Sequence, residues 1–166
     1  MKQCLIFLFA MVLIGCASQP IGTPQPIQTS LPSTASEAHD TLINFFALLN
    51  AENYSEADAL YGGTYEGLQN NNPDIDPSDH AALWARGCKQ NGLQCLEVRS
   101  ATFKELQGDI YVFQVEFSNP DGSLFVLGPC CGANETDMPP VSKFDYAVGR
   151  NAEGKFLVMN EPPYVP

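Results

Sequence analysis

The sequence predicts an α+β fold in which three N-terminal helices pack on one face of a curved antiparallel sheet of about five strands. Apolar residues recur at helical spacing up to about residue 92, and from residue 96 they alternate with polar residues as in strands. Composition sets the limits of the domain. Residues 1–15 have the pattern of a signal peptide, residues 16–35 are rich in Pro, Ser, Thr and Gln, and residues 36–166 have the composition of a single globular domain.

The first helix is predicted over residues 35–50. Thr34 and Glu37 fit a capping box, in which two side chains bond the free N–H groups at a helix start. The apolar residues that follow fall on one helical face: Ala38, Leu42, Phe45, Phe46 and Leu49.

Two further helices are predicted before residue 92. Asn53 with Glu56 repeats the start signal, and the glycine pair at 62–63 ends this second helix. The polar stretch at 70–73 is predicted to be a loop. The sequence DPSD at 76–79 begins a third helix, with its first aspartate as the capping residue. One face of the third helix carries Ala81, Trp84 and Cys88.

Strands are predicted over the rest of the domain. Alternating segments lie at residues 96–103, 111–117, 123–127, 144–148 and 156–160. The alternation of the first strand slips by one residue after Ser100, which predicts a β-bulge or a bend. The sequence NPDG at 119–122 predicts the turn that leads into the third strand.

The N-terminus predicts export and a lipid anchor. Lys2 precedes an apolar run at 4–14, which is too short to cross a bilayer as a helix of about 20 residues but has the length of a secretory hydrophobic region. The run ends in LIGC at 13–16, which resembles the lipobox of bacterial lipoproteins. The resemblance implies a lipid on Cys16 and a membrane-anchored protein of the bacterial cell envelope, facing the extracytoplasmic side. The alternative is an ordinary signal peptide that is cut elsewhere, with Cys16 incidental.

Charge excludes two classes of partner. The chain has 8 Lys and Arg against 19 Asp and Glu, a net charge of −11, and removal of Lys2 with the signal peptide makes it one unit more negative. A nucleic-acid-binding surface would be basic, so nucleic acid is not an expected partner. Anionic lipid head groups would repel the domain, so the membrane contact is assigned to the lipid. The uncharged residues 17–35 are expected to form an extended, disordered tether.

A second resemblance concerns the globular domain. The stretch LINFFALLNAENYSEADALY, at 42–61, is similar to the first two helices of the nuclear transport factor 2-like superfamily, which includes ketosteroid isomerases and scytalone dehydratase. The resemblance implies a cone-like fold, nuclear transport factor 2-like, with a pocket between the first helix and the concave sheet. It implies no activity, because such folds host enzymes and binding proteins alike. The candidate residues for this pocket are Phe45, Phe46, Trp84, Tyr111 and Tyr146.

Four cysteines remain outside the signal peptide and the lipid site: Cys88, Cys95, Cys130 and Cys131. An even number in an exported chain predicts a disulfide framework. Adjacent residues have Cα atoms about 3.8 Å apart, closer than the usual 4.4–6.8 Å of a disulfide, and in extended backbone their side chains point to opposite sides. We therefore expect two bridges that join Cys88 and Cys95 to Cys130 and Cys131, in an order that stays open. A metal site and a vicinal redox disulfide are the alternatives.

Other polar residues give weaker signals. The stretch 72–79 lacks the glycine and glutamate of a calcium-binding EF-hand loop, so helix capping is expected of Asp76 and Asp79, with calcium binding as the alternative. His39 and His80 are expected on solvated helix faces. In ketosteroid isomerases a carboxylate faces a tyrosine across an apolar pocket. The residues on predicted strands that fit this chemistry are Tyr111, Glu116, Asp145 and Tyr146, and no spacing singles one out.

The sequence as a whole predicts a non-catalytic, membrane-anchored binding module. Its expected partners are a protein or a small apolar ligand, and no cofactor or metal is expected. One alternative is an isomerase- or dehydratase-like enzyme that uses the pocket of the cone. Another is a thiol-redox role at Cys130-Cys131.

Overall fold

The computed structural model describes residues 33–166. The predicted signal peptide, the lipid site Cys16 and the predicted tether up to residue 32 lie outside the described residues. The described part is an α+β domain with a four-stranded antiparallel sheet, which confirms the predicted fold class. Within residues 33–166 there are four helices and four strands, so the predicted counts of three and five are wrong.

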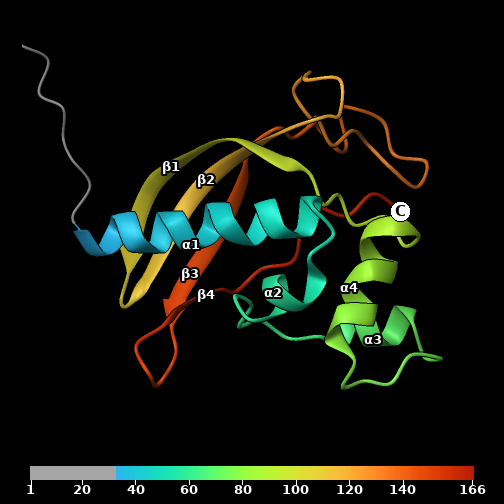
Figure 1. Ribbon diagram of the computed structural model, residues 1–166. Coiled ribbons are helices and arrows are strands. Elements are labelled where there is room, and N and C mark those ends of the chain that lie inside the picture. The colour runs from blue at the N-terminus through green and yellow to red at the C-terminus, as the bar shows by residue number, and fades with distance from the viewer. Residues whose placement is uncertain (1–32) are drawn as a thin grey trace, which may run out of the picture. The chain divides into compact units, whose positions relative to one another are not determined.

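Helix α1 (Ser33–Asn50) lies across one face of the sheet and contacts all four strands (Figure 1). Its buried face is the predicted one with Ala35 added, and consists of Ala35, Ala38, Leu42, Phe45, Phe46 and Leu49. The helix begins before the predicted capping residue, so Thr34 lies inside it. Residues 33–35, which were predicted to be part of the tether, belong to the domain. The buried side chain of Ala35 packs the first turn of α1 against the rest of the domain.

Three short helices follow α1. Helix α2 (Tyr54–Asp58) starts where predicted but ends four residues before the glycine pair, and the side chain of Asn53 makes no capping hydrogen bond. Helix α3 (Glu66–Asn71) was not predicted, and it overlaps the stretch expected to be a loop. Only Leu68 of α3 is buried, so a single apolar residue in a polar run gave no helical spacing to detect.

Helix α4 (His80–Lys89) corresponds to the third predicted helix. Its capping residue is Asp79, whose carboxylate accepts a hydrogen bond of 3.0 Å from the N–H of Ala82. Asp76, the predicted cap, instead accepts hydrogen bonds from the N–H and hydroxyl of Ser78 in the preceding turn, at 2.9 and 2.7 Å. The start signal was therefore correct and the capping residue was wrong by three positions.

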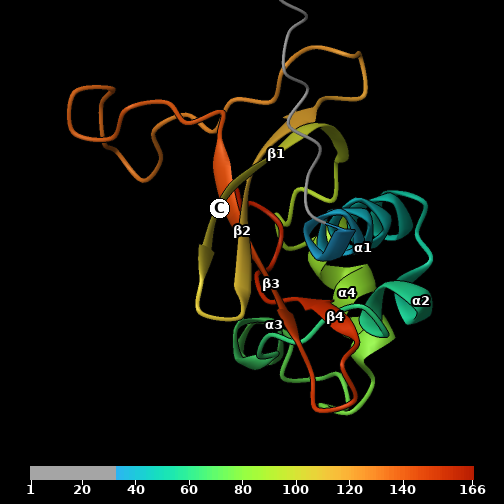
Figure 2. The same cartoon turned by 90° about the vertical axis from the view of Figure 1, so that its left-hand side faces the viewer.

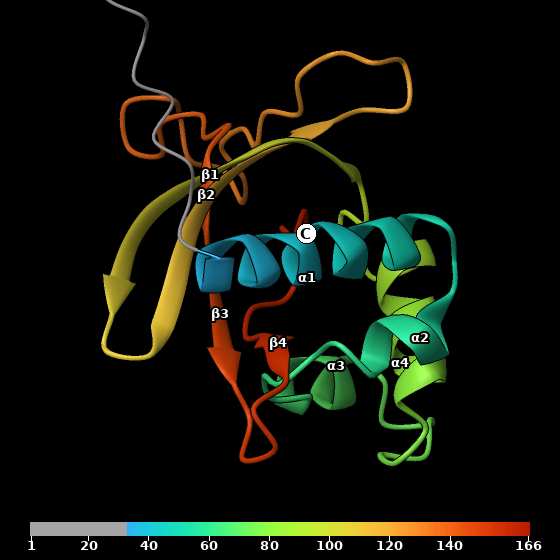
Figure 3. The ribbon, with the colours of Figure 1, turned by 60° about the vertical axis from the view of Figure 1, so that its left-hand side comes forward.

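The sheet has the strand order β1-β2-β3-β4, and every neighbouring pair is antiparallel. The strands are β1 (Glu97–Gln107), β2 (Ile110–Ser118), β3 (Phe144–Arg150) and β4 (Phe156–Val158). The register of β1 against β2 shifts between Val98 and Ser100, which confirms a bulge at the predicted slip, and shifts again between Phe103 and Glu105. Figures 2 and 3 show the resulting curve of β1 and β2 past α1.

The predicted strand at 123–127 is wrong. Residues Leu124 and Leu127 form only isolated bridges, with Ser118 and Val141 respectively. The reason lies in the pairing of β2, which has β1 along one edge and β3 along the other edge as far as Val115. Only the last residues of β2 are free to pair, so the chain leaves the sheet and forms a long loop there.

The C-terminal segment, residues 159–166, returns to the helices. The N–H of Gln94 donates to the carbonyl of Pro163 at 2.7 Å, and the N–H of Val165 donates to the carbonyl of Gly92 at 2.9 Å. Gly92 has a φ of +80°, and a side chain there would collide with the carbonyl of Val165. The segment therefore lies firmly beside the exit of α4, where it forms one side of the site described next.

Candidate functional site

The residues predicted to line a pocket in the cone are mostly core residues. Phe45 and Phe46 on α1 and Trp84 on α4 are fully buried, and Tyr146 on β3 is nearly so. Ring centroids lie 4.9 Å apart for Phe46 and Tyr146 and 5.8 Å apart for Phe45 and Trp84. These rings fill the space between helix and sheet that was predicted to hold a ligand. Tyr111 lies apart from them, at a surface pocket beside the turn between β1 and β2.

A pocket of 290 Å³ opens where α3, the exit of α4 and the C-terminal segment meet. This volume is close to the lower limit of about 300 Å³ for small-molecule sites. The lining residues come from three stretches far apart in the sequence: Gly67, Leu68, Asn71, Asn72, Gly87, Asn91, Leu93, Glu161 and Tyr164. The pocket therefore depends on the return of the C-terminal segment to the helices.

The apolar wall of the pocket is formed by two buried leucines, Leu68 of α3 and Leu93 after α4. Gly87 lies between them on α4. A Cβ atom at this glycine would come within 2.8 Å of both leucine side chains, which is closer than real contacts allow. Glycine at position 87 thus lets α3 approach α4 and keeps the two leucines in place.

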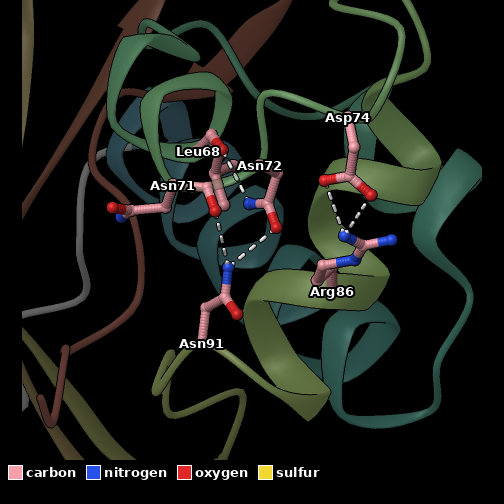
Figure 4. Close-up of polar contacts among 6 residues, drawn as sticks. All are labelled: Leu68, Asn71, Asn72, Asp74, Arg86 and Asn91. Carbon is pink, nitrogen blue, oxygen red and sulfur yellow. Dashed lines mark hydrogen bonds and ion pairs between the residues drawn. The ribbon is translucent and has the colours of Figure 1, made fainter.

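Amide side chains form the polar wall (Figure 4). Asn72 is almost completely buried, and its Nδ2 donates to the carbonyl of Leu68 at 2.7 Å. Nδ2 of Asn91 donates to Oδ1 of Asn72 at 2.8 Å and more weakly to the carbonyl of Asn71 at 3.4 Å. The side chain of Asn71 itself points away from this network (Figure 4). The network joins the end of α3 to the exit of α4 and fixes the orientation of the Asn72 amide.

Glu161 supplies the only acidic side chain of this pocket. It is half-buried, and burial raises the pKa of its carboxyl above the usual value. Within residues 33–166 its carboxylate has neither an ion pair nor a side-chain hydrogen bond. Tyr61 and Glu161 line one wider depression at the surface. Burial raises the pKa of the Tyr61 hydroxyl, and the negative charge of Glu161 raises it further. Gly67 on α3 faces the carboxylate, and a Cβ at Gly67 would lie 3.6 Å from both carboxylate oxygens.

Two wider depressions adjoin the pocket. One of 640 Å³ shares Gly67 and Glu161 and extends over the glycine pair at 62–63, and one of 470 Å³ shares Asn91 and Tyr164. The three hollows form a continuous band along the C-terminal segment. Glu161 lies at the junction of the pocket and the larger depression, because it lines both.

An ion pair closes the loop between α3 and α4. Nη1 of Arg86 lies 2.8 and 2.7 Å from the two carboxylate oxygens of Asp74 (Figure 4). The hydrogen bond from Arg86 lowers the pKa of this carboxyl. Asp74 is exposed, so the pair is worth little in stability. The three aspartates of 74–79 thus bond Arg86, Ser78 and the start of α4.

A second cluster lies beside Trp84 and joins three elements. Tyr65 donates its hydroxyl hydrogen bond to Oδ1 of Asp58, and Nδ1 of His80 lies 3.2 Å from the same oxygen. The rings of Tyr65 and His80 stack with centroids 3.7 Å apart. Burial, and then the hydrogen bond to Asp58, raise the pKa of Tyr65, so its hydroxyl stays protonated and acts as a donor. His80 was predicted to be solvated, but it is half-buried in this cluster of side chains, which joins α2 to α4.

The expected pairing of the cysteines is wrong. Cys88 of α4 is bonded to Cys95, with Cα atoms 5.5 Å apart, so neither is joined to the loop beyond β2. The short turn after α4 brings these two residues together. This pairing was disfavoured because it leaves Cys130 and Cys131, adjacent in the sequence, to pair with each other. Cys130 and Cys131 are free.

The remaining candidate residues for isomerase-like chemistry do not lie together in one site. Asp145 forms an ion pair of 2.5 Å with Lys104, and Glu116 accepts a hydrogen bond of 2.9 Å from Ser100. Tyr146 points to the opposite face of the sheet from its neighbour Asp145, and burial raises its pKa. No carboxylate–tyrosine pair of the isomerase kind forms among these strand residues. His39 lies 3.4 Å from the carboxylate next to it.

Sequence reasoning missed the residues that make the pocket. Leu68, Asn72, Asn91 and Glu161 follow no motif and no shared spacing. The one available signal was an isolated acid followed by Pro162 and Pro163, both of which are buried.

In the described part of the chain, no three His, Cys, Asp or Glu side chains gather closely enough to hold a metal ion. Among the helices of residues 33–166, none has the length and apolarity needed to span a membrane. Comparison with protein-family models and with curated proteins gives no match to this chain.

Proposed function

We propose that this chain is a lipid-anchored lipoprotein of the bacterial cell envelope, whose extracytoplasmic domain is a non-catalytic binding module. We further propose that the domain has the nuclear transport factor 2-like cone fold, with α1 packed on the concave face of the sheet. The ligand proposed for the module is a short apolar molecule or side chain that carries a protonated amine. It would bind in the pocket at Glu161.

The unpaired carboxylate of Glu161 is the observation that carries this proposal. A half-buried carboxylate without a partner is costly, because burial disfavours its charged form. A cation that entered the pocket would supply the missing charge. The buried leucines beside it would hold an aliphatic chain.

The core supports a binding module over an enzyme. The aromatic rings of Phe45, Phe46, Trp84 and Tyr146 occupy the space in which the isomerase-like alternative would place its substrate. Among the described residues that line the pocket, Glu161 is the one acid, Tyr164 is the one other titratable group, and there is no Lys, Arg, His or Cys. A single carboxylate among leucine and amide side chains suits recognition of a cationic charge.

The N-terminal sequence supports the anchor. A basic residue, a short apolar run and LIGC at 13–16 occur in the order of a lipoprotein signal. The bonded pair Cys88–Cys95 fits an oxidising compartment outside the cytoplasm.

Binding can be mapped by nuclear magnetic resonance on the ¹⁵N-labelled full-length chain in detergent. Butylammonium serves as the cationic probe and 1-butanol as its neutral counterpart of similar size. We expect butylammonium to shift the amide signals of Gly67, Gly87 and Leu93, and 1-butanol to shift them far less. Equal shifts with both probes, or shifts spread over the sheet, would refute the site. The matched variant is Glu161→Gln, which keeps the shape and removes the charge.

A further inference from the structure

The long loop after β2 carries a feature that the proposed ligand pocket does not use. The loop leaves the sheet after Ser118 and projects beyond the ends of β2 and β3 (Figures 2 and 3). Burial of Phe125, stacked on Phe144, anchors its first part. Two hydrogen bonds of 2.8 Å between the backbones of Leu127 and Val141 then close its base. Residues 128–140 therefore form a closed, projecting loop on a fixed base.

A tight turn in this loop places two thiols on the same side. The N–H of Ala133 donates to the carbonyl of Cys130 at 2.9 Å, and both central residues, Cys131 and Gly132, have positive φ values of 59° and 88°. Such values are typical of a type I′ turn. Because the backbone is not extended here, the sequence argument that adjacent side chains diverge does not apply. The two Sγ atoms lie 2.7 Å apart.

The surroundings do not favour thiolates. The loop carries Glu135 and Asp137 and no Lys or Arg between residues 128 and 142. Cys131 is exposed and Cys130 is partly exposed. Contact with Cys131, and then burial, raise the pKa of the Cys130 thiol. A pair of protonated thiols is poorly suited to nucleophilic catalysis, because the thiolate is the nucleophile. The 2.7 Å between their sulfur atoms and their exposure still suit them to closing a disulfide with each other once a cysteine has lost its proton.

We propose that Cys130 and Cys131 are a reversible redox site, which is oxidised to a vicinal disulfide by thiol–disulfide exchange with a small-molecule or protein disulfide. One cysteine, after losing its proton, attacks a sulfur of the incoming disulfide and forms a mixed disulfide, and the first thiol of the partner leaves. The second cysteine, also deprotonated, attacks the sulfur of the first and releases the second thiol of the partner. Two protons and two electrons pass from the loop to the partner, whose disulfide becomes two thiols.

The vicinal disulfide should be reduced more easily than the bond within the domain. Adjacent Cα atoms are about 3.8 Å apart, which is below the usual disulfide range of 4.4–6.8 Å. The eight-membered ring that a disulfide between adjacent cysteines closes is therefore strained. Strained and exposed disulfides have higher reduction potentials than structural ones. The Cα distance of 5.5 Å between Cys88 and Cys95 lies inside the usual range. The two disulfides of the chain are thus expected to separate into a labile one and a resistant one.

Digestion with trypsin makes the site separately measurable. Cleavage after Lys104 and Lys143 releases residues 105–143, a peptide that contains only this cysteine pair. The detergent-solubilised full-length chain is equilibrated in glutathione buffers from reducing to oxidising, quenched in acid, alkylated and analysed by mass spectrometry. We expect the unalkylated peptide, two hydrogen atoms lighter than the dithiol, to appear and disappear at potentials where Cys88–Cys95 stays intact. Only glutathione adducts, links between two chains, or thiols that stay reduced throughout would overturn the proposal.

Two variants control the experiment. Cys130→Ser should abolish the internal disulfide completely and leave a single glutathione adduct on Cys131. Gly132→Ala should lower the fraction of vicinal disulfide at a given potential, because alanine is strained at a φ of 88° and alters the turn. Circular dichroism checks that both variants are folded. The inference that the site meets disulfides in the cell depends on the proposed export, but this experiment is done on the purified chain and is independent of it.

Discussion

The buried amide of Asn72 allows a sharp test of the site's architecture. Asn72→Ala removes two hydrogen bonds, the one donated to Leu68 and the one accepted from Asn91. It also leaves a buried carbonyl and part of the Asn91 amide without partners. Leaving a buried polar group unsatisfied costs about 1–3 kcal/mol. We expect the free energy of unfolding to fall by about 2–3 kcal/mol.

The neighbouring asparagine is the matched control. Asn71 is exposed, and only its backbone carbonyl takes part in the network, so Asn71→Ala should change stability by less than about 0.5 kcal/mol. Both variants are measured by urea unfolding at neutral pH, with thermal unfolding as a second readout. For a domain of this size, about 1 kcal/mol corresponds to roughly 2–4 °C in Tm. Equal effects of the two substitutions, or no loss with Asn72→Ala, would refute the network.

Four further outcomes are expected. Gly87→Ala should fill the space between the pocket leucines, lowering stability by about 1–3 kcal/mol in thermal unfolding and abolishing the amide shifts caused by butylammonium. The double variant Cys88→Ser with Cys95→Ser should lose about 2–3 kcal/mol in urea unfolding, in the chain-entropy description of a short closed loop. Tyr65→Phe should cost about 1 kcal/mol by the same assay, since the carboxylate it bonds is partly solvated. Cys16→Ala should move the protein from the membrane fraction to the soluble fraction, and an unchanged distribution would contradict the lipid anchor.

The elements that could be predicted are those with a repeating apolar face. Five of the six buried residues of α1 were predicted from their helical spacing, and the alternation of β2 and β3 marks strands that pair across the sheet. The slip after Ser100 also had a direct structural counterpart, because a bulge changes which face each later residue occupies.

The elements that could not be predicted depend on tertiary contacts. Helix α3 buries only Leu68, so its sequence has no spacing to read. The segment 123–127 alternates like a strand, but both edges of β2 are already taken along most of its length. Pairing within a sheet is a property of the neighbours and cannot be read from the strand alone.

The pocket at Glu161 could be predicted even less, because residues far apart in the sequence form it. Glu161 and Asn72 lie far apart in the chain, and the bonding of residues 159–166 to the exit of α4 brings them to one pocket. Aromatic residues on α1 and the sheet were natural candidates for a ligand pocket. Their size is the reason they are core residues instead, because large rings fill the space between the layers.

The pH dependence of butylammonium binding distinguishes a cation site at Glu161 from a purely apolar pocket. Binding of butylammonium requires ionised Glu161, whose pKa in the free protein is raised by burial. The affinity, measured by isothermal titration calorimetry, should therefore be greatest above that pKa and fall as the pH is lowered through it, with a proton released on binding in this range. Glu161→Gln should weaken binding at high pH and remove the pH dependence altogether. An affinity that is independent of pH in the wild-type chain, or unchanged in Glu161→Gln, would contradict the proposed recognition of a cation by this carboxylate.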